Sequence, residues 1–133
     1  MTHICCLATA ESKDIPLLSA VLKAAGEPAL AILARLDVTE LHKVGPDVLV
    51  ADVDGLSIDP LEILRQLRFV LPNCVMAIYT AVTTPTWSRD CHLAGANGIL
   101  SKESPESELA NGLRKAIQSG CFTDPRIALS LGI

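Results

Sequence analysis

The sequence contains few aromatic residues, no cluster of basic residues and no long apolar run. Only 3% of the 133 residues are aromatic although 50% are hydrophobic, so the core must consist mainly of Leu, Ile, Val and Ala. The net charge is -4 and the basic residues are dispersed, so we do not expect this chain to bind nucleic acid directly. Residues 1–3 do not begin a signal peptide, and no apolar run could span a bilayer. We therefore expect a cytoplasmic chain with no membrane contact.

The cysteines do not follow a pattern typical of disulfides. Their number is odd, and no CxxC spacing occurs. Cys5, Cys6 and Cys74 lie in or beside apolar runs, which predicts buried free thiols in a reducing compartment. Cys91 and Cys121 are expected to be more peripheral, and nothing in the sequence supports a redox role for them.

Short apolar runs alternate with segments of helical spacing along the whole chain. The runs lack the polar alternation of half-exposed strands, which favours strands buried on both faces. The pattern predicts five strands and five helices, and hence a single α/β domain with a doubly wound parallel sheet. The expected strands are residues 4–8, 29–33, 48–51, 75–79 and 99–100. The expected helices are residues 15–22, 38–44, 61–71, 86–94 and 109–117.

Several predicted helices begin with a recognisable capping signal. A capping side chain stands before a proline in three places, where the missing amide hydrogen of proline costs nothing. A fourth start resembles a capping box, in which a side chain accepts from the first turn. These starts are Asp59-Pro60, Thr84-Pro85, Ser104-Pro105 and Asp37–Glu40.

Polar residues follow several of the predicted strands. Because the carboxyl ends of parallel strands meet at one edge of the sheet, sites gather there. Asp52 ends the third strand, Thr80 follows the fourth and Lys102 follows the fifth. We therefore expect a carboxylate, a hydroxyl and an ammonium group to lie at one edge.

Three segments resemble those of response-regulator receiver domains, in the same order and spacing. Residues 46–52 are similar to the strand that carries the phosphoacceptor aspartate, and residues 77–81 to the strand with the switch Thr or Ser. Residues 95–102, Gly-Ala-Asn-Gly-Ile-Leu-Ser-Lys, are similar to the family's Gly-Ala-x-Gly-Tyr-Leu-x-Lys segment. Residues 104–120 resemble receivers that precede LuxR-type DNA-binding domains.

The resemblance implies both a fold and roles for individual residues. The fold is the CheY-like, flavodoxin-like (βα)5 arrangement with strand order 2-1-3-4-5. Asp52 would be the phosphoacceptor, Thr80 the switch hydroxyl and Lys102 the contact to the phosphoryl oxygens. The receiver-like domain would cover residues 1–120, and residues 121–133 would form a C-terminal tail or the start of a linker.

The sequence departs from the family where receivers hold Mg²⁺. Thr9 and Ala10 replace the two acidic residues that follow the first strand, and neither binds a hard cation as a carboxylate does. Ile99 replaces the aromatic residue to which the family couples its switch hydroxyl. We therefore expect no bound metal, slow or absent phosphorylation, and no enzymatic activity. The leading interpretation is a pseudo-receiver in two-component signalling that acts by protein–protein contact.

Two alternatives remain open at this point. The chain would be an ordinary phosphoaccepting response regulator if Asp54 or Glu11 restored Mg²⁺ binding. It would be a small-molecule-binding flavodoxin-like domain if an enclosed pocket lay at the strand ends.

The expected partners are proteins. The resemblance implies a histidine kinase or an output protein, and homodimerisation through the fourth helix, fifth strand and fifth helix. Trp87, the single tryptophan, lies in the fourth helix region and is either a packing residue or a partner contact. The three histidines are scattered and do not have metal-ligand spacing.

Overall fold

The predicted apolar runs form one parallel sheet. The computed structural model describes residues 4–27, 31–82 and 84–124. All five predicted strands are present within these residues, and the expected positions 29 and 30 of the second lie outside them. The strands are β1 Cys5–Ala8, β2 Ala31–Leu33, β3 Val48–Asp52, β4 Val75–Thr80, β5 Gly98–Ser101 and β6 Phe122–Thr123, in the order β2-β1-β3-β4-β5-β6.

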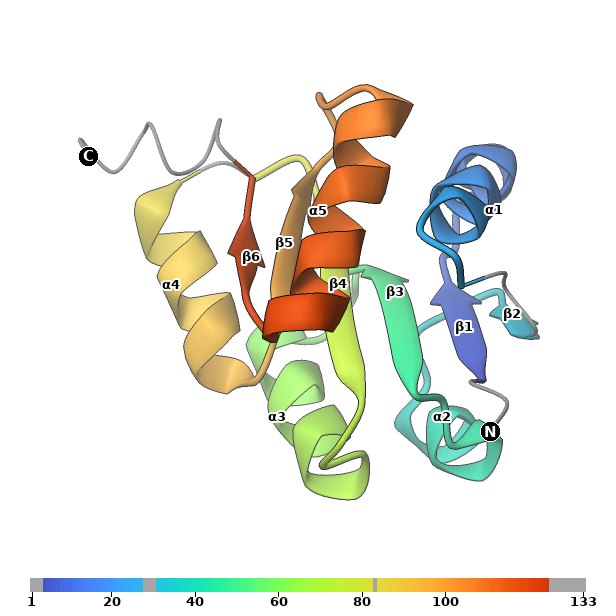
Figure 1. Cartoon of the computed structure of the whole chain (residues 1–133). Coiled ribbons are helices and arrows are strands. Elements are labelled where there is room, and N and C mark those ends of the chain that lie inside the picture. The colour runs from blue at the N-terminus through green and yellow to red at the C-terminus, as the bar shows by residue number, and fades with distance from the viewer. Residues whose placement is uncertain (1–3, 28–30, 83, 125–133) are drawn as a thin grey trace.

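Helices cover both faces of this sheet (Figure 1). Strand side chains alternate between two cores, so Leu7 and Val50 pack with α1 and α5, whereas Cys6 and Leu49 pack with α2, α3 and α4. The helices are α1 Ile15–Ala24, after the short 3-10 turn Ser12–Asp14, α2 Val38–Val44, α3 Pro60–Val70, α4 Pro85–Ala94 and α5 Glu106–Ser119. Within the described residues, none of these helices has the length and apolar character needed to cross a membrane.

The sixth strand corrects the prediction of five. β6 follows α5 directly and pairs in parallel with β5, the strand expected at the edge of the sheet. The amide of Phe122 donates to Asn97 (2.9 Å) and that of Asp124 donates to Ile99 (3.0 Å). Two residues are too few for a periodic pattern, which is why the segment was expected only as tail or linker. The division of the chain at residue 120 stays a prediction.

Side chains hold β6 between α4 and α5. The Phe122 ring lies over Gly112, where a Cβ would come within 2.4 Å of a ring carbon. The Thr123 hydroxyl is 2.8 Å from Nε2 of His92 on α4, and the Ser104 hydroxyl donates to Asp124. The short strand therefore depends on tertiary contacts to both neighbouring helices.

The predicted helix starts are confirmed in part. The carboxylates of Asp37 and Asp59 accept from the amides of Glu40 and Leu61, each at 3.0 Å. The prediction for Ser104 was wrong, because α5 begins one residue later and the Ser104 hydroxyl is bound to Asp124. At α4, Thr84 precedes the first helical residue but makes no side-chain cap.

The cysteines are free, and four of the five are buried. Cys91 was expected to be peripheral, which is wrong, because α4 turns its thiol into the core. Burial raises the pKa of Cys6 to about 11 and those of Cys74 and Cys91 to about 12. Burial, followed by the hydrogen bond to Glu27, raises the pKa of Cys5 to about 12. Cys121 is exposed.

We predict that one of the five thiols reacts rapidly with Ellman's reagent at pH 8 and that the other four react only after unfolding. The buried thiols are both inaccessible and protonated, and the thiolate is the reactive form. Absorbance with and without denaturant measures the two populations. The Cys121→Ser variant should lose the fast phase, and a remaining fast phase would contradict the burial of the others.

Replacing Gly112 by alanine should detach β6. The added Cβ would collide with the Phe122 ring, whereas alanine favours the helix by about 1 kcal/mol over glycine, so α5 should persist. Amide hydrogen exchange should then accelerate at Phe122 and Asp124. Asn111→Ala, on the exposed side of α5, serves as the control. Unchanged protection at both amides would show that the ring contact does not hold the strand.

Candidate functional site

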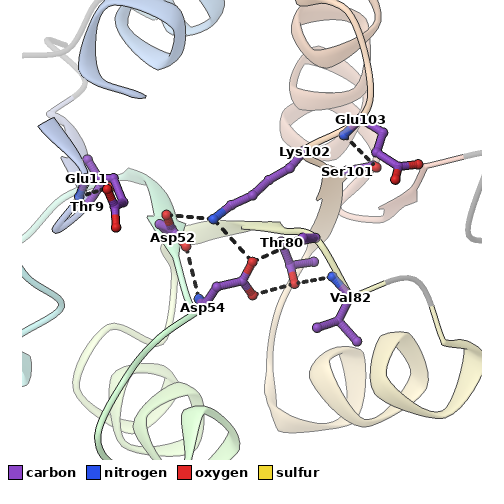
Figure 2. A network of polar contacts seen from close by, with 10 residues as sticks. Thr9, Glu11, Asp52, Asp54, Thr80, Val82, Ser101, Lys102 and Glu103 are labelled. Carbon is purple, nitrogen blue, oxygen red and sulfur yellow. Dashed lines mark hydrogen bonds and ion pairs between the residues drawn. The ribbon is translucent and has the colours of Figure 1, made fainter. Parts of the chain in front are cut away.

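The polar residues predicted from the sequence gather at the carboxyl edge of the sheet. The register pairs Asp52 of β3 with Tyr79 of β4, and Thr80 of β4 with Ser101 of β5. Lys102 comes directly after β5, and its amide donates to the Thr80 carbonyl (2.9 Å). Figure 2 shows the resulting cluster, with the Lys102 side chain extending from the end of β5 toward Asp52.

Both oxygens of the Asp52 carboxylate are engaged. Oδ2 lies 3.0 Å from Nζ of Lys102, and Oδ1 accepts from the amide of Asp54 at 3.0 Å. The Asp52 side chain is only 4% exposed, so the ion pair is shielded from solvent. The predicted phosphoacceptor and the predicted phosphate-contacting lysine are thus in direct contact.

Thr80 is bound to Asp54, two residues beyond Asp52. The fully buried Thr80 hydroxyl donates to Oδ1 of Asp54 at 2.7 Å. The amide of Ala81 donates to Oδ2 of Asp54 at 2.8 Å. The hydroxyl also accepts from the amide of Val82 at 3.1 Å, which fixes its orientation. Thr80 is therefore connected to Asp52 through Asp54 and Lys102.

Lys102 is shared by two carboxylates. Its Nζ lies 3.0 Å from Asp52 and 3.2 Å from Asp54, and 5.4 Å from the centre of the Tyr79 ring. Burial alone lowers the pKa of Lys102, but the hydrogen bonds and charges of the two aspartates outweigh it, so the pKa lies above 10.5. The ammonium group is therefore charged at neutral pH.

The end of β1 contributes no carboxylate to this cluster. Thr9 is buried, and its hydroxyl accepts from the amide of Glu11 at 3.1 Å. Ala10 and Glu11 are exposed, and Figure 2 shows Glu11 beside Thr9, away from Lys102. In the part of the chain that the structure describes, no three His, Cys, Asp or Glu side chains form a group that could hold a metal ion.

The other singled-out residues pack into the cores. Trp87 lies partly buried against the core beneath α4, and its indole nitrogen finds no acceptor among the described residues. Ile99 and Tyr79 are both buried, on opposite faces of the sheet. The role of Trp87 as a partner contact stays a prediction. Leu93, on the same helix, is the more exposed of the two side chains, at 79%.

Sequence reasoning underestimated Asp54. It was considered only as a substitute metal ligand, but its carboxylate binds the hydroxyl, amide and ammonium groups around it. The signal was an acidic residue two positions after a strand-end aspartate, beside a predicted hydroxyl and lysine. The direction of its side chain depends on the loop after β3, which no periodic pattern describes.

A separate groove of about 500 Å³ lies at the amino ends of β4 and β5. Residues around it include Cys74, Val75, Asn97 and Cys121. Arg68 also lines it, but its guanidinium is bound to backbone carbonyls of Gly95 and other residues. This groove is at the opposite end of the strands from Asp52.

Comparisons with known proteins find transcriptional regulators among the similar proteins. No protein-family model matches the chain. The methanol utilization control regulatory protein MoxX of Paracoccus denitrificans is 28% identical over 90 residues, which cover 66% of this chain and 40% of that protein. The DNA-binding transcriptional activator EvgA of Escherichia coli K12 is 26% identical over 98 residues, covering 70% and 48%. The chain spans less than half the length of these curated relatives.

The fold is also shared with solved structures. A LuxR-family two-component response regulator from Aurantimonas sp. SI85-9A1 superimposes with a TM-score of 0.82 at 22% identity, covering 99% of this chain and 96% of that one. Together with the curated relatives, this structure confirms the resemblance to response-regulator receivers. The chain has the CheY-like fold with an additional parallel strand.

We predict that Lys102→Met destabilises the protein by about 1–3 kcal/mol at pH 7, because two clustered carboxylates lose their shared cation. In the unmodified protein, Lys102 has a raised pKa, so its stabilisation is complete below about pH 10.5 and is lost as the pH rises above it.

Urea unfolding between pH 7 and pH 12 measures this dependence. The control is Lys43→Met, which removes an exposed ion pair to Glu40 on α2 and should cost no more than about 0.5 kcal/mol. Equal effects of the two substitutions at pH 7 would contradict the central position of Lys102.

Proposed function

We propose that this chain, with the fold and motifs of a response-regulator receiver, is an atypical receiver domain of two-component signalling that acts by protein–protein contact. The observation that carries the proposal is the combination found at the sheet edge. Asp52, Lys102 and Thr80 are retained there, whereas β1 ends in Thr9 and Ala10. The domain has the residues that would contact a phosphoryl group but lacks the acidic pair.

Phosphoryl transfer to Asp52 would place further negative charge in a site that is already negative. The carboxylate would attack phosphorus and the leaving group would depart, while nearby cations neutralise the charge. Lys102 is the cation present at this position, and it is already shared between Asp52 and Asp54. Phosphorylation is therefore disfavoured on electrostatic grounds.

The residues around Asp52 do not fit Mg²⁺, which takes an octahedron of oxygen ligands including one or two carboxylates. The Asp54 carboxylate is directed at Thr80, Ala81 and Lys102. Restoration of a metal site by Asp54 would require these contacts to break. We propose that the domain binds no metal and has no turnover of its own.

The two alternatives receive less support. An ordinary phosphoaccepting regulator is favoured by the preserved Asp52–Lys102 contact, but it needs the compensating cation. For a small-molecule-binding domain, an enclosed pocket at this edge is required, and the groove of about 500 Å³ lies at the other end of the strands.

The proposed partner is a protein, either a histidine kinase or an output protein. Homodimerisation through α4, β5 and α5 is part of the proposal. β6 pairs with the edge of β5 and lies between α4 and α5 (Figure 1). A dimer formed there would include β6 in its interface. No nucleic-acid contact is proposed for this chain.

Incubation with acetyl phosphate and Mg²⁺, followed by intact mass spectrometry, tests the proposal. We expect no gain, or only a slow gain, of one phosphoryl group because the negative charge that the phosphoryl group adds would be uncompensated. A rapid gain that disappears in Asp52→Asn would show an ordinary switch and overturn the proposal.

The double variant Thr9→Asp/Ala10→Asp provides the matched comparison. If the missing acidic pair limits phosphorylation, this variant should be labelled faster than the unmodified chain. Thr9→Asn/Ala10→Asn, which is similar in shape but uncharged, should not. Equal labelling of both variants would show that the acidic pair is not the limiting feature.

A further inference from the structure

Asp54 is held by three hydrogen-bond donors from two strand ends. The Thr80 hydroxyl (2.7 Å), the Ala81 amide (2.8 Å) and the Lys102 ammonium group (3.2 Å) surround its carboxylate. Thr80 is the last residue of β4 and Ala81 follows it, and Lys102 directly follows β5. Figure 2 shows the Asp54 carboxylate between Asp52 and Thr80. The donors thus belong to the sheet, whereas the carboxylate comes from the loop after β3.

The three donors form a site for an anion. A hydroxyl, a backbone amide and an ammonium group directed at one point match the oxygens of a carboxylate or of a tetrahedral oxyanion. Their positions are set by the sheet register and by the hydrogen bond that the Lys102 amide donates to the Thr80 carbonyl at 2.9 Å. They should keep this arrangement when the loop carboxylate is removed, because the strands that carry them are buried.

The loop is anchored so that the carboxylate fills this site. The amide of Asp54 donates to Asp52 at 3.0 Å, and the next residue, Gly55, has a positive φ of 73° that favours glycine. These two features direct the Asp54 side chain toward β4 and β5. The Asp54 side chain is 24% exposed, so the site borders on solvent and a small anion could reach it.

We propose that Asp54 is a built-in anionic ligand, which fills an oxyanion site beside Asp52 and keeps Thr80 and Lys102 in their anion-bound arrangement. Removal of its carboxylate opens the site to a phosphate-type oxyanion. The inference deepens the proposed function, because it explains how the receiver-like site is occupied without phosphorylation. It requires neither Mg²⁺ nor a covalent step.

The test is the titration of Asp54→Ala with inorganic phosphate in the absence of Mg²⁺, followed by amide NMR. The Ala81 amide should shift saturably, with phosphate bound about tenfold or more tightly than by the unmodified chain, because the competing carboxylate is gone. Adding Thr80→Val to this variant should weaken the binding. The control is Glu103→Ala, which removes a nearby negative charge on an exposed residue without opening the donor set.

Two results would overturn the inference. One is the absence of a saturable shift at Ala81 in a folded Asp54→Ala protein, and the other is equal phosphate binding by the unmodified chain. If alanine prevents folding, Asp54→Ser provides a second variant, whose shorter side chain should still open the donor set and bind phosphate more tightly than the unmodified chain. Rapid phosphorylation of the unmodified chain by acetyl phosphate would contradict the proposed function but would leave this metal-free titration to decide the role of Asp54.

Discussion

One ammonium group holds the carboxyl edge of the sheet together. Lys102 comes from the end of β5, yet it contacts Asp52 at the end of β3 and Asp54 in the following loop. Asp54 in turn binds Thr80 of β4, so the side chains of Lys102 and Asp54 together connect three adjacent strand ends. The Tyr79 ring lies 5.4 Å below the ammonium group and adds a cation–π contact. Without this cation, two partly buried carboxylates would repel each other.

The cluster forms because the sheet brings these ends into register. Aliphatic side chains fill both faces of β1, β3, β4 and β5, so their order and alignment follow from burial. These strands were predictable, because each is an uninterrupted apolar run bounded by turn residues. The two-residue β6 was not, because its position depends on Gly112, His92 and Asn97, which are distant from it in sequence.

The same distinction applies to the site. The meeting of Asp52, Thr80 and Lys102 at one edge followed from strand order, since each residue directly follows or ends a strand. The contacts among them could not be predicted. A carboxylate two residues into a loop can face solvent or the sheet, and only the Ala81 amide and the Thr80 hydroxyl select the second direction. The assignment of Asp52 as phosphoacceptor stays a prediction.

The residues at the end of β1, Thr9 and Ala10, and the position of Asp54 after β3 fit a cluster in which a lysine, and no metal ion, faces the carboxylates. Two carboxylates and one ammonium group leave the cluster with a single negative charge. A divalent cation at this position would have to displace Lys102 from Asp52 and Asp54, and β1 supplies Thr9 and Ala10 rather than further carboxylates. Lys102 contacts both carboxylates and so offsets part of their mutual repulsion. Asp54 also supplies the acceptor for the Thr80 hydroxyl and the Ala81 amide. The uncharged residues Thr9 and Ala10 at the end of β1 and the engagement of Asp54 therefore favour the same arrangement, in which the carboxylates are bound by groups of the chain itself.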